Sequence, residues 1–158
     1  MDPKQREQLV AQYRDGYTAI AEALLKITDA ELDARPGPGR WSAREIVHHL
    51  ADSEMNAAIR LRRLLTEDRP AIEGIDQDEF ARRLHYDRPY EASLEAFRWA
   101  RASTVELLER LTPDDWRREG THSEIGPFGV ERWLEIYGQH AHRHARQILE
   151  ARRTVVGD

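Results

Sequence analysis

Apolar side chains recur at steps of three and four over the first part of the chain. The positions are Val10, Tyr13, Tyr17, Ile20, Leu24 and Ile27. On an α-helix this spacing places the side chains along one face, so the pattern predicts an amphipathic helix over Lys4–Ile27. The next residues have room for a helical turn at Ala30–Leu32, before the prolines and glycines at 36–39 impose a loop.

The sequence WSAREI carries a complete helix start. Ser42 can cap the first turn, Glu45 can reach back to the cap, and Trp41 can pack on Ile46 as a hydrophobic staple. These signals predict a second helix that begins at Ser42 and runs to about residue 65. Its core face carries Ile46, Val47, Leu50, Ala57, Leu61 and Leu64.

After the second helix comes a connecting segment, Thr66–Pro89, which has room for one short helix around DQDEFARRLH. Two further amphipathic helices are predicted after it. The third helix, within 90–111, carries its apolar positions at Leu94, Phe97, Ala100, Thr104, Leu107, Leu108 and Leu111, and Thr112 can cap a new turn after it. The sequence REGTHSEIGPFG then fits either an irregular loop or a small hairpin. The fourth helix carries Val130, Trp133, Leu134, Tyr137, Ala141, Ile148 and Ala151.

Four long amphipathic helices without a convincing strand pattern predict an all-α fold, an antiparallel four-helix bundle. The chain has 158 residues, which matches one domain over residues 1–158. Hydrophobic residues make up 40% of the chain and charged residues 34%, which excludes a largely disordered or membrane-spanning protein. The four tryptophans, Trp41, Trp99, Trp116 and Trp133, are expected in core packing or in a staple.

Charge and cysteine content restrict the partners. The net charge is −5, and basic residues alternate with acidic ones, which argues against nucleic acid as a partner. No apolar run could span a bilayer and MDPKQREQLV lacks the apolar part of a signal peptide, so we expect a cytoplasmic protein with no membrane partner. Cysteine is absent. Any thiol chemistry therefore needs a small-molecule thiol.

The stretch YGQHAHRHARQ places three of the seven histidines at alternate positions of the fourth helix. At about 100° per residue, His140 and His144 fall within or beside the core stripe, whereas His142 points toward solvent or the rim. Imidazoles at i and i+4 can share one metal ion, which would satisfy one nitrogen of each ring. The pair alone also fits a chance arrangement on a solvated helix face.

A third ligand can come from the second helix, where EIVHHLADSEMN holds two adjacent histidines. The same rotation places His49 at the edge of the core, in a polar strip with Ser53, Asn56 and Arg60, and turns His48 outward. A boundary histidine bonded to a carbonyl is an equally good interpretation of His49.

Glu54 falls inside the apolar stripe of the same helix, where a carboxylate needs a partner. We favour an ion pair with an arginine such as Arg101 over a role in orienting a metal ligand. His85 and His122 lie in predicted loops and are expected at the surface.

The segments WSAREIVHHLADSEMNAAIRLRRLLTEDRPAI and IYGQHAHRHARQI together resemble the DinB superfamily, especially its YfiT-like branch of metal-dependent hydrolases. The likeness runs from about Thr28 to Leu149. It implies a four-helix bundle that usually forms a homodimer and binds one divalent metal ion, nickel or zinc, on three histidines. Carried over by position, these are His49 and the pair that the helical rotation also selects, His140 and His144.

Three neutral imidazoles leave at least one coordination position open for a water molecule or a substrate. Because a metal can lower the pKa of bound water to about 7, we favour an enzyme, a hydrolase acting on a small-molecule substrate. The resemblance also implies an alternative, an S-transferase that uses a low-molecular-weight thiol at the same metal. A further alternative is a dimer that binds metal or ligand without catalysis.

Two departures from the YfiT-like branch affect the expected site. Glu54 stands where those chains can carry another histidine, although the wider superfamily often has glutamate there. The N-terminus is also short compared with some relatives. Glu54 and Asn56 are the candidates for proton handling or for orienting a ligand. The segments Thr66–Pro89 and Gly120–Gly129 are expected to determine substrate specificity.

Overall fold

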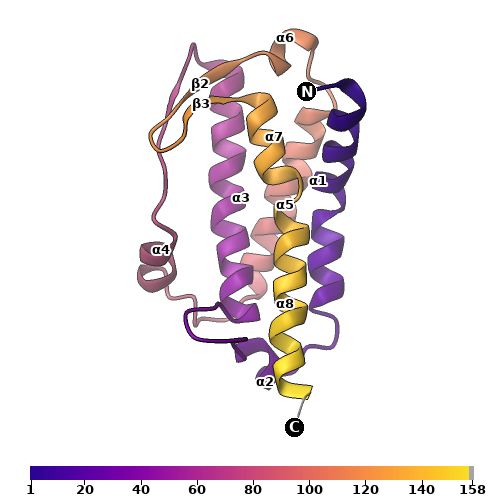
Figure 1. Cartoon of the computed structure of the whole chain (residues 1–158), viewed down its shortest axis with the longest axis vertical. Helices are drawn as coiled ribbons and strands as arrows, with labels where there is room; N and C mark the ends of the chain where they lie inside the picture. Colours follow the sequence, from indigo (N-terminus) through magenta and orange to yellow (C-terminus); the bar gives the residue numbers. More distant parts are fainter. Residues whose placement is uncertain (157–158) are drawn as a thin grey trace.

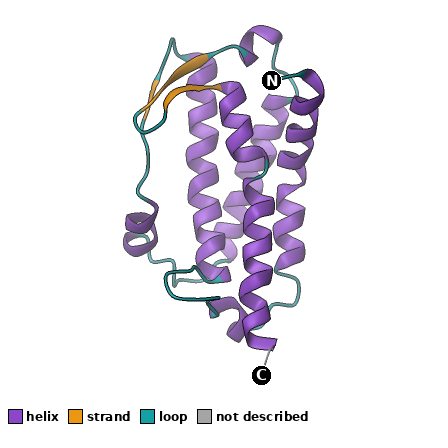
Figure 2. Cartoon of the chain, in the orientation of Figure 1, coloured by secondary structure: helices purple, strands orange, loops and turns teal. Residues whose placement is uncertain are grey.

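The computed structural model describes residues 1–156 as four long helical columns (Figures 1 and 2). Three columns are α1 (Pro3–Ala23), α3 (Ala43–Thr66) and α5 (Glu91–Leu108), and the fourth is α7 (Val130–Gly138) followed end to end by α8 (His140–Val156). The connections contain α2 (Asp29–Asp33), α4 (Gln77–Arg83) and α6 (Pro113–Trp116). The predicted four-helix bundle is confirmed. No helix in this part of the chain is long and apolar enough to cross a membrane.

Two columns run in each direction, but α3 and α5 follow each other along the chain and run parallel. Side chains of α3 contact α5 at both ends of the pair, through His48 to Ser93 and Arg62 to Thr104, with residue numbers rising together. The segment after α3 returns to the other end of the bundle before α5 begins (Figure 1). α7 and α8 then run antiparallel to α3.

Helix ends follow the local chemistry of the chain. Ser42 accepts the main-chain N–H of Glu45, and the Glu45 carboxylate accepts the N–H of Ser42, so the predicted capping box is present. The first helix is shorter than predicted and ends at Ala23, because Lys26 adopts a φ of 53°, which an α-helix cannot contain.

The predicted fourth helix is interrupted at Gln139, so that His140 is the first residue of α8. Gly138, just before the break, lies against α1, where an added Cβ would be 3.1 Å from Leu9 Cδ2. Glycine also has low helix propensity. The break therefore lies at a close approach of α1 and directly before the histidine-rich stretch.

A small sheet caps one end of the bundle, although the sequence carries no convincing strand pattern. β2 (Glu119–His122) and β3 (Gly126–Gly129) form the hairpin that the sequence allowed, with Gly120 opposite Phe128. β1 (Ala71–Ile72) pairs parallel to β2, with Ala71 opposite Thr121. Two residues are too few to show an alternating pattern, which is why β1 has no signal in the sequence.

The apolar core forms two clusters along the bundle. The cluster nearer the sheet includes Trp133, Phe128 and Leu61, and the other includes Ile46 and Ile148. Arg101 of α5 touches both, because its guanidinium lies over Tyr13 of the first cluster and Phe97 of the second, at 3.9 and 5.0 Å from the ring centroids. The junction of the two clusters is therefore charged.

Arg101 is paired with Glu54, as the sequence favoured. The two side chains are 2% and 1% exposed, with Arg101 Nη2 at 3.2 Å from Glu54 Oε2. The hydroxyl of Tyr13 donates to the same carboxylate. Arg101 also donates to the main-chain oxygens of Tyr13 and Tyr137, at 3.1 and 3.4 Å. One buried guanidinium thus joins α1, α3 and α7.

Two histidines and one tryptophan differ from the predictions. His48 is fully buried, not turned outward, because α5 and the segment before it cover that side of α3. His48 Nε2 donates to the carbonyl of Arg88 at 3.0 Å, and its Nδ1 accepts the Ser93 hydroxyl at 2.7 Å. His122 is also buried, since its ring packs on Phe128 within the hairpin. His85 is exposed, as predicted.

Trp99 is exposed on α5, where its indole N–H donates to Glu95, so the prediction of core packing is wrong for this residue. A three-four spacing cannot tell which flank of a helix a neighbour covers. Trp116 and Trp133 are buried as expected, and Trp41 is half-buried.

We predict that Arg101→Met lowers the free energy of unfolding by about 3 to 5 kcal/mol at pH 8, because it leaves the buried Glu54 carboxylate without its counter-charge. Burial raises the pKa of Glu54 and Arg101 lowers it, so the variant raises that pKa further. The folded variant then holds a proton that the unfolded chain releases, and its unfolding free energy decreases as pH rises above the unfolded pKa.

Urea denaturation of both proteins at pH 5 and pH 8 measures this difference. The double variant Glu54→Leu/Arg101→Met should recover much of the loss, because neither charge is then buried. Arg63→Gln, which breaks the exposed pair with Glu67, is the control and should cost less than about 1 kcal/mol. An Arg101→Met loss that is small and independent of pH would contradict the prediction.

Candidate metal centre

Three imidazoles meet between α3 and α8. His140 Nε2 lies 3.4 Å from His49 Nε2 and 3.1 Å from His144 Nε2, and one nitrogen from each ring lies within 4.8 Å of the others. The rings are steeply inclined to one another, at 61° to 88°. The structure therefore brings together the three histidines that the sequence selected.

Helix geometry explains the convergence. His140 and His144 are one turn apart at the start of α8, so their side chains lie on the same face. His49 lies in the second turn of α3, which runs antiparallel to α8 at this level. His142, between the pair, is half-buried on another face and donates from Nε2 to the carbonyl of Gln12 on α1, at 2.9 Å. It takes no part in the cluster.

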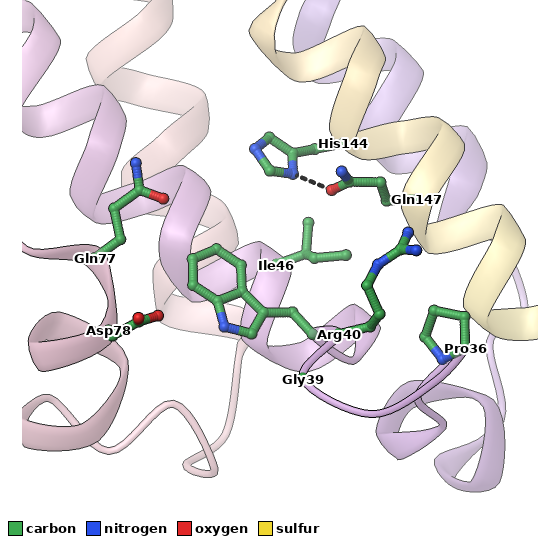
Figure 3. Close-up of a pocket in the computed structure, with 9 residues that line it drawn as sticks. Pro36, Gly39, Arg40, Ile46, Gln77, Asp78, His144 and Gln147 are labelled. Atoms are coloured by element: carbon green, nitrogen blue, oxygen red, sulfur yellow. Dashed lines mark hydrogen bonds between the residues drawn. The ribbon is translucent and has the colours of Figure 1, made fainter.

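Gln147 determines which nitrogen of His144 is free. His144 Nδ1 lies 2.7 Å from Gln147 Oε1 (Figure 3). An amide oxygen only accepts hydrogen bonds, so Nδ1 carries the proton and Nε2 presents a lone pair to the cluster. A partner on the second ring nitrogen is the usual support of a histidine metal ligand.

All three rings are held in the neutral form. Burial, followed by the charge of His144, lowers the pKa of His49 to about 3. Burial lowers the pKa of His144 to about 4 and that of His140 well below its ordinary value. Neutral imidazole is the form that binds metal ions. The cluster is therefore ready to accept a cation at neutral pH.

The spacing fits a divalent transition metal. Two ligands at about 2.0 to 2.1 Å from a tetrahedral zinc ion are about 3.3 Å apart. The separations of His140 Nε2 from the nitrogens of His144 and His49, 3.1 and 3.4 Å, lie on either side of that value, and all three nitrogens lie within 4.8 Å of one another. Lone pairs at such distances repel unless a proton or a cation lies between them. The donor set and its geometry thus fit a metal ion.

A pocket of about 270 Å³ opens beside the cluster (Figure 3). His144 and Gln147 face it from α8, and Gln77 and Asp78 face it from α4. The other lining residues are Pro36, Gly39, Arg40, Trp41 and Ile46. Trp41 also packs on His49, with ring centroids 4.7 Å apart. A small molecule in this pocket would contact the histidine cluster through His144.

The expected roles of Glu54 and Asn56 have no contact to support them. Glu54 is bonded to Tyr13 and Arg101 in the core, and Asn56 donates its side-chain amide to the carbonyl of Asp52 at 2.8 Å. No hydrogen bond within residues 1–156 links either side chain to His49, His140 or His144. The position of Asn56 in the polar strip of α3 did not reveal its bond to Asp52, whereas the pairing of Glu54 with Arg101 is the one that the sequence favoured.

Gln147 is a site residue that sequence reasoning missed, and Gln77 and Asp78 were covered only by the expectation that the segment Thr66–Pro89 determines specificity. Gln147 follows His144 by three residues, a spacing that brings side chains together on a helix, and it could have been found from that signal. Trp41 was expected in core packing or in a staple, not beside a ligand pocket. The approach of α4, which adds Gln77 and Asp78, depends on tertiary packing and has no local signal.

Comparison with known proteins agrees with the fold. The family model of the DinB superfamily matches residues 12–148, and the chain therefore belongs to the DinB superfamily. A protein of Oceanobacillus iheyensis, named as a putative metal-dependent hydrolase, is 33% identical over 129 residues, which cover 82% of this chain and 75% of the relative.

YfiT from Bacillus subtilis, also named as a putative metal-dependent hydrolase, is 32% identical over 161 residues, covering 95% of this chain and 90% of YfiT. Its solved structure is described as a probable metal-dependent hydrolase with an unusual four-helix bundle topology. That structure superposes with a TM-score of 0.91 at 28% identity, over 99% of this chain and 90% of the other. The resemblance inferred from the sequence is confirmed.

We predict that the metal-free protein becomes less stable as pH falls below about 6.5, the ordinary pKa of histidine. The unfolded chain then binds protons at three histidines that stay neutral in the fold, so its free energy decreases relative to the folded state. Above that pH both states are neutral and the three residues contribute no slope.

Urea denaturation in the presence of a chelator, between pH 7 and pH 5, measures the slope. His49→Leu should reduce it by up to about 1.4 kcal/mol per pH unit, which corresponds to one proton. The exposed His85, replaced by glutamine, is the control for a histidine outside the cluster. Parallel curves for the parent and His49→Leu would show that His49 titrates alike in both states, against the prediction.

Proposed function

We propose that this protein is a divalent-metal-dependent hydrolase that holds one metal ion on His49, His140 and His144. The observation that carries the proposal is the convergence of three neutral imidazole nitrogens within 4.8 Å beside an open pocket. The names of the relatives from Oceanobacillus iheyensis and Bacillus subtilis support the same reaction class. Zinc and nickel are the expected metals, because imidazole suits both.

The number of ligands supports a catalytic rather than a structural site. Structural zinc is almost always held by four protein ligands, whereas a catalytic ion keeps a position open. The converging group within residues 1–156 consists of three histidines. When bound, the metal supplies Lewis-acid polarisation and a nucleophile at neutral pH.

Neighbouring side chains orient the histidine ligands and cover them from solvent. Gln147 holds His144 with Nε2 free, and Trp41 covers one side of His49. His144 and Gln147 form part of the pocket lining, so the substrate is expected to approach from that side. Within residues 1–156 no carboxylate forms a hydrogen bond or ion pair with the three imidazoles, and we therefore assign no general base to Glu54.

The two other functions that the sequence left open stay as outcomes of the test. A thiol-dependent S-transferase would turn over only when a low-molecular-weight thiol and an electrophile are both supplied. A non-catalytic dimer would bind metal without turnover of either kind. The homodimer and the cytoplasmic location stay predictions.

We predict one equivalent of zinc or nickel in the purified untagged protein. His49→Ala, His140→Ala and His144→Ala should each reduce metal affinity by at least about tenfold, because each removes one of three ligands. Mass spectrometry of the metal content, with circular dichroism to show that the helices remain, makes the measurement.

His142→Ala is the matched control, since it removes a histidine from the same stretch of α8 that bonds to Gln12 instead of the cluster. It should keep the full equivalent of metal. A parent protein that binds neither ion after incubation would overturn the proposed function. Esters and amides, with and without added thiol, then separate hydrolysis from thiol transfer.

We predict that Gln147→Leu weakens metal binding by about 10- to 100-fold, because His144 loses the acceptor that keeps its proton on Nδ1. Gln147→Glu retains an acceptor and should bind metal at least as well as the parent. Competition with a zinc-sensitive dye gives both affinities. Equal affinities for the leucine and glutamate variants would show that this hydrogen bond does not tune the site.

A further inference from the structure

The pocket beside the histidine cluster carries one charge of each sign. Among the described residues that line it, Arg40 and Asp78 are the charged ones, and the others, His144 included, are apolar or uncharged. They come from the loop before α3 and from α4. In Figure 3 Asp78 lies with Gln77 on one side, Arg40 lies with Gln147 on the other, and His144 lies above and between them.

The guanidinium of Arg40 is available to a ligand. Its present partner is Glu150, at 2.9 Å, and the two side chains are 48% and 50% exposed. An ion pair that is this exposed contributes little, because water screens it. Glu150 does not line the pocket, so a carboxylate that enters the pocket can replace it on Arg40 without breaking the core.

The carboxylate of Asp78 is left without a counter-charge. Within residues 1–156 its side chain makes no hydrogen bond or ion pair. The basic residues that follow on α4, Arg82 and Arg83, both bind Glu79 instead, at 2.7 and 2.6 Å. Asp78 therefore offers an unpaired acceptor to a cation in the pocket.

We propose that this pocket selects small zwitterions whose two charges are separated, with dipeptides as the simplest class. The cleavage of such a ligand rests on the proposed hydrolase function, whereas its binding in the pocket does not. The carboxylate of the ligand lies on Arg40, its ammonium group on Asp78, and its body against Trp41. The bond between the two charged ends then lies nearest His144.

That placement matches amide hydrolysis. Cleavage breaks the C–N bond between the charged ends, the hydroxyl of water joins the carbonyl carbon, and the nitrogen of the leaving amine takes up the proton. Both products are again amino acids. The pocket volume of about 270 Å³ also favours a ligand of this small size over a longer peptide.

Three matched peptides test the inference: Gly-Phe, its N-acetyl derivative, which has only the negative charge, and its C-terminal amide, which has only the positive charge. Calorimetric or NMR titration of the full chain, first metal-free and then with zinc, gives their affinities. Gly-Phe should bind about fivefold more tightly than either blocked peptide, because each exposed charge pair contributes up to about that factor.

Two variants assign the ends. Arg40→Gln should lower the affinity for Gly-Phe to that of the amide and leave the amide unaffected. Asp78→Asn should lower it to that of the acetylated peptide and leave the latter unaffected. Arg146→Gln, at an exposed arginine of α8 that does not line the pocket, is the control and should change none of the three affinities.

Equal binding of the three peptides, or no binding of any, would overturn the zwitterion proposal. Because the first titration needs no metal, the two proposals fail separately. Charge-selective peptide binding in a protein that takes up neither zinc nor nickel would contradict the hydrolase function and support the pocket inference. Normal zinc uptake without peptide selectivity would support the proposed metal site and contradict the pocket inference.

Discussion

The buried guanidinium of Arg101 fixes how α1, α3 and α7 are aligned along their axes. The geometry of the metal centre depends on that alignment. Arg101 binds Glu54 on α3, the carbonyl of Tyr13 on α1 and the carbonyl of Tyr137 on α7. Tyr137 lies one turn before His140, and Glu54 lies little more than one turn after His49. A slip of either helix by one turn would break these bonds and separate the imidazoles. The ion pair thus acts on the site through the register of the helices.

Beside Arg101, the close packing of α1 on α8 helps to bury the charged guanidinium. Gly16 lies where an added Cβ would be 2.8 Å from Ala141 Cβ and 3.1 Å from Arg101 Cζ, so α1 can pack directly on the residue after His140. The same burial keeps the imidazoles neutral. A buried ion pair adds little net stability compared with an apolar core, and its value here is that it specifies one alignment.

The sequence predicted what depends on one helix and missed what depends on its neighbours. The cap at Ser42 and the spacing of His140 and His144 are set by local rotation, and the structure shows both, with His49 of α3 beside the pair. His48 is buried because α5 packs on that side of α3, and Trp99 is exposed because no helix packs on its side of α5 within residues 1–156. The spacing of apolar residues within one helix does not contain that information. The prediction for both residues was therefore wrong.

The parallel arrangement of α3 and α5 also explains how the pocket is built. Two parallel helices that follow one another need a return segment as long as the bundle, and residues 67–90 provide it. Antiparallel neighbours could have been joined by a short turn, with nothing beside the histidines. Because the return passes the open side of the cluster, α4 can add Gln77 and Asp78 to the pocket wall. This order of helices therefore gives the bundle a wall that a simple up-and-down bundle would lack.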